Sequence, residues 1–162
     1  MTPARLVAAV GVLTIAVAAT ASAQTATQTV TFQVDAINQV AVSGSPSLTI
    51  NAAVPGSAPT QVSSTGHTWS VTTNQTGAKI TASIASNMPS GLTLQATLGV
   101  GATGATSTGA KTLSTVAQDM VTGITKLNAT GLTLGYTLDA TAAAGVVTSS
   151  SRVVTFTITG GT

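Results

Sequence analysis

The chain has 162 residues, of which 5% are charged and 2% are aromatic, and it contains no cysteine. With five Lys and Arg against three Asp and Glu, it lacks the dense basic patch that neutralises phosphates, which excludes a nucleic-acid-binding protein. One histidine and no cysteine leave too few ligands for a zinc site, and no disulfide can form.

Residues 1–23 have the three parts of a cleaved signal peptide. Arg5 precedes an uncharged apolar run at residues 6–19, and residues 21–23 read Ala-Ser-Ala, the small-residue pattern of a signal-peptidase site. The run of about 14 residues is shorter than the roughly 20 that a membrane-spanning helix needs. We therefore expect an exported protein, extracellular or at the cell surface, whose mature form is one domain at residues 24–162. If the cell has an outer membrane, export passes through the periplasm.

Apolar and polar residues alternate through most of the mature chain, as they do in half-buried β-strands. Turn clusters rich in Gly, Pro, Asn and Ser separate the alternating runs. Spacings of about 8–12 residues without a helical period indicate an all-β protein: a single antiparallel, immunoglobulin-like β-sandwich of about eight to ten strands. The expected strands are residues 29–36, 39–43, 48–51, 67–74, 79–85, 92–98, 112–117, 120–124, 131–140 and 154–159.

The last two expected strands have the strongest patterns. Leucines and Tyr136 share one face of residues 131–140, and Val154, Phe156 and Ile158 share one face of the final strand. We expect residues 141–147 to join the two strands into an antiparallel hairpin with one apolar face. The rest of the chain then supplies the second layer that covers this face.

Residues 79–98 and 119–138 are similar to each other at an offset of 40. Ile84 matches Ile124, and Gly-Leu-Thr-Leu occurs at both 91–94 and 131–134. We interpret the similarity as one strand–loop–strand unit used twice, as two hairpins in one sandwich. Chance similarity in a chain so rich in Thr, Leu and Gly is the alternative.

The first expected strand is the candidate assembly site. Val30, Phe32, Val34 and Ala36 share one face of it, and the surrounding surface carries almost no charge to repel a partner. An unpaired strand offers its backbone donors and acceptors to another chain. The segment is therefore a candidate donor strand for a neighbouring subunit, unless it pairs within its own domain.

Two aromatic residues and the threonine-rich strand faces are candidates for surface binding. Trp69 and Tyr136 are the residues suited to stacking on a sugar, although a lone tryptophan in a sandwich is commonly a core residue. Thr155, Thr157 and Thr159 form a T-x-T array of the kind that ice-binding proteins use, and Thr is also frequent on any exposed strand.

The sequence offers little material for catalysis. His67 is the only histidine, and no nucleophile motif accompanies it. Residues 99–104 fit G-x-G-x-x-G, but no helix-forming segment follows to hold a dinucleotide phosphate. A calcium site would require the fold to bring Asp35, Asp119 and Asp139 together. We expect no catalytic residue, no cofactor and no metal site.

The final residues resemble a known class of surface proteins. Ala144-Gly145-Val146 followed by Val-Val-Thr-Phe-Thr-Ile-Thr at 153–159 resembles the C-terminal strand of bacterial fimbrial, pilin-like β-sandwich subunits. The run from His67-Thr-Trp69 to Asn74 is similar to secreted WxL-type surface domains, although a second Trp-x-Leu is absent. The resemblance implies a pilin-like sandwich with a surface or appendage function, and it carries over no functional residue.

Two functions follow as expectations. The first is a non-enzymatic structural subunit of a cell-surface filament, pilus or coat, a homopolymer or an assembly with other surface subunits, formed by strand addition through residues 24–36. The alternative is a monomeric extracellular binding or adhesion module for a glycan, ice or a protein surface.

Overall fold

The computed structural model describes residues 22–162, and residues 1–21, which hold most of the expected signal peptide, lie outside the described part. The described residues are essentially all-β, with 46% in strands. The chain divides into two units, of which the second, Val34–Thr162, holds every strand. In the first unit, residues 22–33 form no strand.

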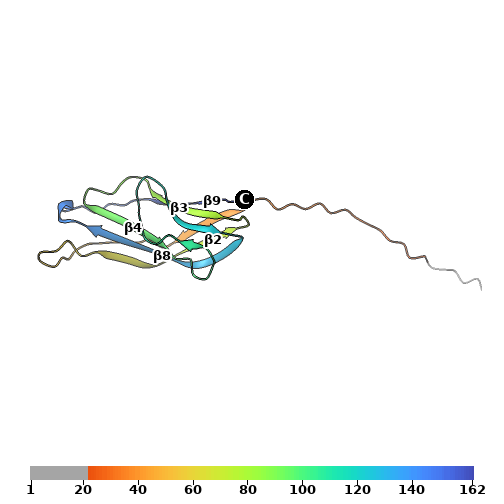
Figure 1. Cartoon of the computed structure of the whole chain (residues 1–162), viewed down its shortest axis with the longest axis horizontal. Helices are drawn as coiled ribbons and strands as arrows, with labels where there is room; N and C mark the ends of the chain where they lie inside the picture. Colours follow the sequence, from red (N-terminus) through yellow and green to blue (C-terminus); the bar gives the residue numbers. More distant parts are fainter. Residues whose placement is uncertain (1–21) are drawn as a thin grey trace, which may run out of the picture. The chain divides into compact units, whose positions relative to one another are not determined.

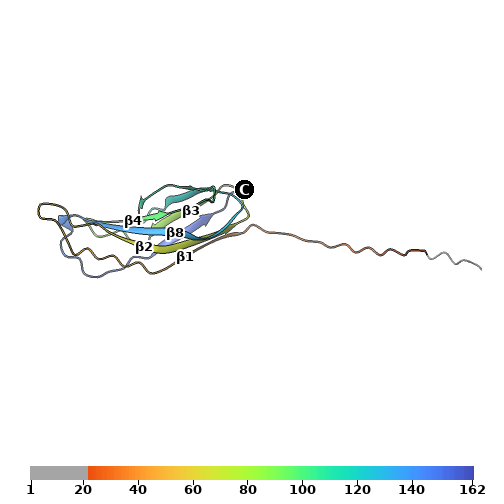
Figure 2. The same ribbon diagram turned by 90° about the horizontal axis from the view of Figure 1, so that it is seen from below.

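Two antiparallel sheets form the second unit, and they lie face to face as two layers (Figures 1 and 2). The five-stranded sheet has the order β1-β2-β8-β4-β6 and the four-stranded sheet the order β5-β7-β3-β9. The strands are β1 (Asn38–Ser43), β2 (Val62–Thr73), β3 (Ala78–Ile84), β4 (Leu92–Leu98), β5 (Thr106–Ser107), β6 (Lys111–Thr112), β7 (Gln118–Ile124), β8 (Leu127–Ala140) and β9 (Val154–Thr159), and a single 3-10 turn, η1 (Ala142–Ala144), follows β8. This confirms the expected all-β, sandwich-like architecture.

The core lies between the sheets and follows the alternation of the strands. On β3, Ala78, Ile80, Ala82 and Ile84 are fully buried, while the residues between them are half-buried. Leu98, Met120 and Ile124 are among the other large side chains in the same cluster. Burying aliphatic side chains stabilises a fold by roughly 1.5–3 kcal/mol each, so the cluster holds the two sheets together without disulfides.

The expected C-terminal hairpin is wrong. β8 pairs with β2 and β4, whereas β9 pairs with β3 in the other sheet. The two strands carry apolar faces that pack toward the same core from opposite layers, so residues 141–153 connect the sheets. If β8 and β9 paired side by side, both of their apolar faces would lie in one sheet, and another layer would have to cover both.

Three other expected strands also differ. Residues 29–36 and 48–51 form no strand, because no strand of the described chain lies in register to complete a ladder with them. Of the expected strand at 112–117, only Lys111–Thr112 pairs, with β4. β2 and β8 are longer than expected, starting at Val62 and Leu127, because they pair with each other along most of their length.

Each copy of the repeated unit contributes one strand to each sheet, so neither copy is a hairpin. β3 and β7 are antiparallel neighbours in one sheet, and β4 and β8 are antiparallel neighbours in the other. Ala96 pairs with Tyr136, which is its own counterpart at the offset of 40. Each copy therefore crosses from one sheet to the other, and the two copies pair antiparallel in both sheets.

Candidate functional site

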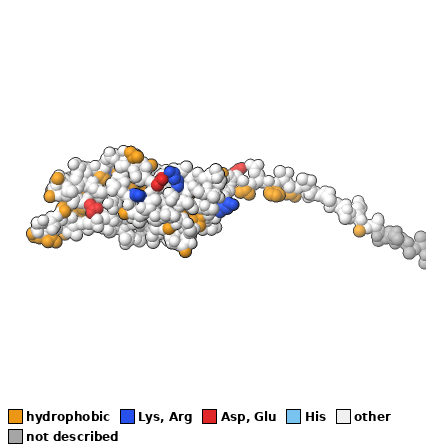
Figure 3. Space-filling model, in the orientation of Figure 1, with side chains coloured by type: hydrophobic (Ala, Val, Ile, Leu, Met, Phe, Trp, Pro, Cys, Tyr) orange, Lys and Arg blue, Asp and Glu red, His pale blue; other side chains and the backbone are white. Residues whose placement is uncertain are grey.

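The N-terminal segment, residues 24–36, exposes its apolar side chains. Val30, Phe32 and Val34 are 72%, 89% and 77% exposed, and Ala36 is exposed as well. Exposing a row of large apolar side chains at alternate positions is unfavourable in water. Hydrophobic atoms are visible along this extended segment in Figure 3. The structure thus leaves all four candidate assembly residues uncovered within the chain.

Asn74 fixes the point where the N-terminal segment enters the sandwich. Its Nδ2 donates a 2.8 Å hydrogen bond to the carbonyl of Asp35, and its Oδ1 accepts a 2.8 Å bond from the backbone N–H of Ile37. The backbone N–H of Asn74 donates in turn to the carbonyl of Ile37 at 3.3 Å. Residues 35–37 are therefore held beside the end of β2, directly before β1.

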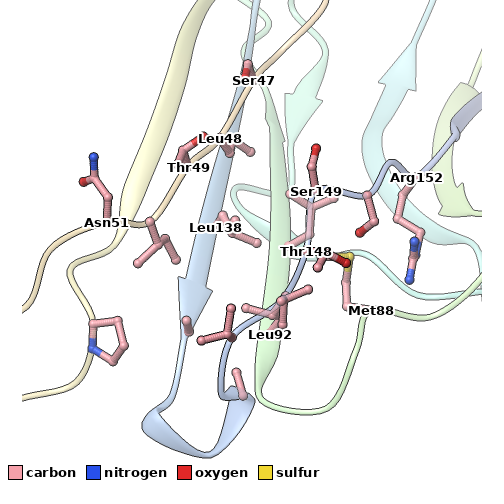
Figure 4. Close-up of a pocket in the computed structure, with 18 of the residues that line it drawn as sticks. Ser47, Leu48, Thr49, Asn51, Met88, Leu92, Leu138, Thr148, Ser149 and Arg152 are labelled. Carbon is pink, nitrogen blue, oxygen red and sulfur yellow. The ribbon is translucent and has the colours of Figure 1, made fainter.

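A groove of about 910 Å³ opens toward the far end of the sandwich (Figure 4). Its floor is the inner face of β4 and β8, and includes Leu92, Leu94, Tyr136 and Leu138. The four-stranded sheet stops at the Ile84–Val154 pair, so no strand covers this part of the floor. As a result, the second layer of the sandwich is incomplete here.

Two chain segments, the groove rims, flank this floor. They are residues 46–51, which follow β1, and residues 146–152, which lead into β9. Both run without a turn, and across residues 22–162 neither makes a backbone–backbone hydrogen bond. Backbone N–H and C=O groups require partners, and in a strand-like segment another strand supplies them. In Figure 4, Thr49 and Asn51 of the first rim lie to the left of the blue strand β8, and Ser149 of the second rim lies to the right of the green strand β4.

The groove is nearly uncharged. Arg152 is the one charged side chain among its lining residues; its Nε donates to the carbonyl of Asn87 at 3.2 Å, and its Nη1 donates to the carbonyl of Ser151 at 2.8 Å. Asp35 is the one charged residue of the N-terminal segment. The groove and the N-terminal segment therefore carry no like charges that would repel each other.

The N-terminal segment also repeats the sequence of β9, a signal that the strand-by-strand reading missed. Residues 30–34 read Val-Thr-Phe-Gln-Val, and residues 154–158 read Val-Thr-Phe-Thr-Ile. In β9, Val154, Phe156 and Ile158 are half-buried against the hydrophobic core. Apolar side chains of this kind, at this spacing, therefore pack against the core of this protein.

The two aromatic candidates for surface binding lie in the core. Trp69 is 1% exposed, and its Nε1 donates a 2.9 Å hydrogen bond to the carbonyl of Gly99. Tyr136 is 7% exposed and packs edge-on against His67, with ring centroids 6.2 Å apart. Burial raises the pKa of the Tyr136 phenol. Trp69 is therefore enclosed by the core, whereas Tyr136 also lines the groove floor.

The few titratable side chains do not gather into a reactive cluster. His67 Nε2 is 2.8 Å from Ser64 Oγ, and Lys79 Nζ forms a 2.9 Å ion pair with Asp119. Asp139 accepts a hydrogen bond from Gln61. Among residues 22–162, no three His, Cys, Asp or Glu side chains come together in a group that could hold a metal ion. Figure 3 shows how sparse the charged side chains are on the visible face.

The remaining motifs lie on the surface of the sandwich. The glycine-rich residues 99–104 form a turn between β4 and β5, and no helix follows them. Thr155, Thr157 and Thr159 are exposed on the outer face of β9, as expected. Their strand neighbours on β3 are Ser83, Thr81 and Lys79.

Comparison of the chain with protein-family models, curated proteins and solved structures gives no match. Within residues 22–162, no helix has the length and apolar character needed to cross a lipid bilayer. Fold and site are therefore the only basis for a functional assignment.

Proposed function

We propose that this protein is an exported, non-enzymatic structural subunit of a cell-surface filament, pilus or coat, with a pilin-like sandwich that assembles by β-strand addition through residues 24–36. The observation that supports this proposal is the exposure of Val30, Phe32 and Val34 in a segment whose described residues, 22–36, form no strand. A soluble monomer gains nothing from an alternating apolar row held in water, whereas a neighbouring subunit can cover it.

The low charge of the chain supports the same assignment. Soluble monomers usually carry mixed charges and a net charge that keeps molecules apart. Lys79 and Asp119 form an ion pair, and Thr, Ser and Gly are frequent among the other residues of the chain. Electrostatic repulsion between copies is therefore weak and adds little to the free energy of bringing two subunits into contact.

The test is negative-stain electron microscopy together with size-exclusion chromatography of residues 24–162. Ordered fibres with a regular repeat are expected, and Phe32→Asp is expected to abolish them, because the new carboxylate would have to be buried in the subunit contact. Thr31→Asp is the matched control: it adds the same charge on the polar side of the same segment and should disturb assembly less. Fibres that persist in Phe32→Asp would refute strand donation.

A second candidate is a monomeric binding or adhesion module. The exposed Thr155, Thr157 and Thr159 row favours it, since a flat threonine array suits contact with ice, a glycan or a protein surface. A stable monomer at high concentration, with no fibres, would support this candidate. Replacing Thr157 with Lys would then be expected to weaken the surface interaction without unfolding the protein.

A further inference from the structure

The groove and the attachment point of the N-terminal segment, residues 35–37, lie at opposite ends of the sandwich. Residues 35–37 are bound to Asn74, beside the end of β2 that pairs with Leu127. The groove floor lies at the other end of β8, at Tyr136 and Leu138. At about 3.3 Å per residue, the nine residues from Leu127 to Tyr136 span roughly 30 Å.

Val30, Phe32 and Val34 lie too close to the anchored end of the N-terminal segment to reach the groove of their own chain. Phe32 precedes Ile37 by five residues, which extend at most about 18 Å. That length is well below the roughly 30 Å that separates the anchored end from the groove floor. If these three side chains occupy a groove, it must therefore be the groove of a second copy.

We propose that residues 29–34 of a second copy insert into the groove as an added strand between the two rims, an inference that rests on the strand-addition function proposed above. The added strand lies in the layer of β9 and completes the part of that layer that ends at Ile84 and Val154. Its knobs Val30, Phe32 and Val34 cover the apolar floor, and its backbone pairs with the rims. The β9-like sequence of the segment suits this position.

The arrangement is heterologous, because one end of each subunit donates and the opposite end accepts. Such a contact does not close on itself when the donor and acceptor surfaces lie at opposite ends, and it propagates into an open chain. Each internal subunit donates one strand and accepts one strand. Only the terminal subunits keep an empty groove or an uncovered segment.

Site-directed crosslinking tests the position of the added strand, since the native chain contains no cysteine. Thr31→Cys protein is mixed with Ser149→Cys protein, assembled into fibres and treated with a short bismaleimide. The control partner is Thr157→Cys, which lies on the outer face of β9. Covalent dimers are expected with Ser149→Cys and at a several-fold lower yield with Thr157→Cys. Fibres that crosslink only through Thr157→Cys would overturn the groove assignment while leaving strand addition intact.

A capping measurement tests the polarity without modifying the groove. The Phe32→Asp protein retains its groove but cannot donate a strand, so it should join one fibre end and stop growth there. Added at a tenth of the wild-type concentration, it is expected to shorten wild-type fibres several-fold. Unchanged fibre length, with the variant left outside the fibres, would overturn the groove as acceptor. If the wild-type protein forms no fibres at all, the proposed function itself fails.

Discussion

Two phenylalanines in the same local sequence offer the sharpest test of the assembly mechanism. Phe32 and Phe156 each stand in a Val-Thr-Phe run, but Phe32 is 89% exposed in the chain and Phe156 is half-buried against the core. Replacing each with alanine makes the same chemical change in two different environments. The two variants therefore separate a role in assembly from a role in folding.

The expected sizes of the two effects follow from burial. Covering a phenylalanine is worth roughly 1.5–3 kcal/mol, so Phe32→Ala should cost the subunit contact about 2 kcal/mol. At 1.4 kcal/mol for each factor of ten, the critical concentration for fibre formation should rise roughly 30-fold. The free energy of unfolding of the Phe32→Ala monomer should change by less than about 0.5 kcal/mol, as at other exposed sites. Phe156→Ala should instead lower it by about 2 kcal/mol, roughly half the loss at a fully buried site.

The assay pairs fibre sedimentation over a concentration series with urea unfolding of the soluble fraction. Strand donation would be refuted if Phe32→Ala destabilised the monomer as much as Phe156→Ala does, because the N-terminal segment would then pack within its own chain. An unchanged critical concentration in Phe32→Ala would show that the contact between subunits lies elsewhere.

Three further predictions concern the sandwich itself. Gly91 has φ +81°, and a Cβ there would lie 2.7 Å from the backbone nitrogen of Ala144, so Gly91→Ala should lower the free energy of unfolding by about 1–3 kcal/mol in urea titrations. Because burial raises the pKa of Tyr136 above 10.0, the unfolded state loses the phenolic proton first as pH rises. The contribution of Tyr136 to the free energy of unfolding should therefore be constant below pH 10 and fall above pH 10. The free energy of unfolding of Tyr136→Phe should fall less over the same range, and an equal fall in both proteins would contradict the prediction. Lys79→Ala should cost under about 1 kcal/mol by thermal unfolding, because the Lys79–Asp119 pair is nearly half exposed, and a larger loss would show it to be structural.

The sequence by itself determined the local features of this protein. Period-two alternation predicted β4 at its observed bounds and placed Leu134 and Tyr136 on the apolar face of their strand, where both are buried. The composition predicted an all-β chain whose stability rests on sheet pairing and packing. The turn cluster predicted at residues 87–91 contains the observed turn at Ser90–Gly91 between β3 and β4, where Gly91 has φ +81°. These properties depend on neighbouring residues alone.

The tertiary structure decided which strands pair. Alternation shows which side of a strand is apolar, but not which strand lies beside it, and so β8 and β9 were expected in one sheet and lie in two. It also decided that Trp69 lies in the core and that residues 46–51 border a groove. The N-terminal segment has the alternation of a strand, yet its described residues, 22–36, form none. A strand needs a second chain segment to satisfy its backbone, and where that segment lies is a property of the whole fold.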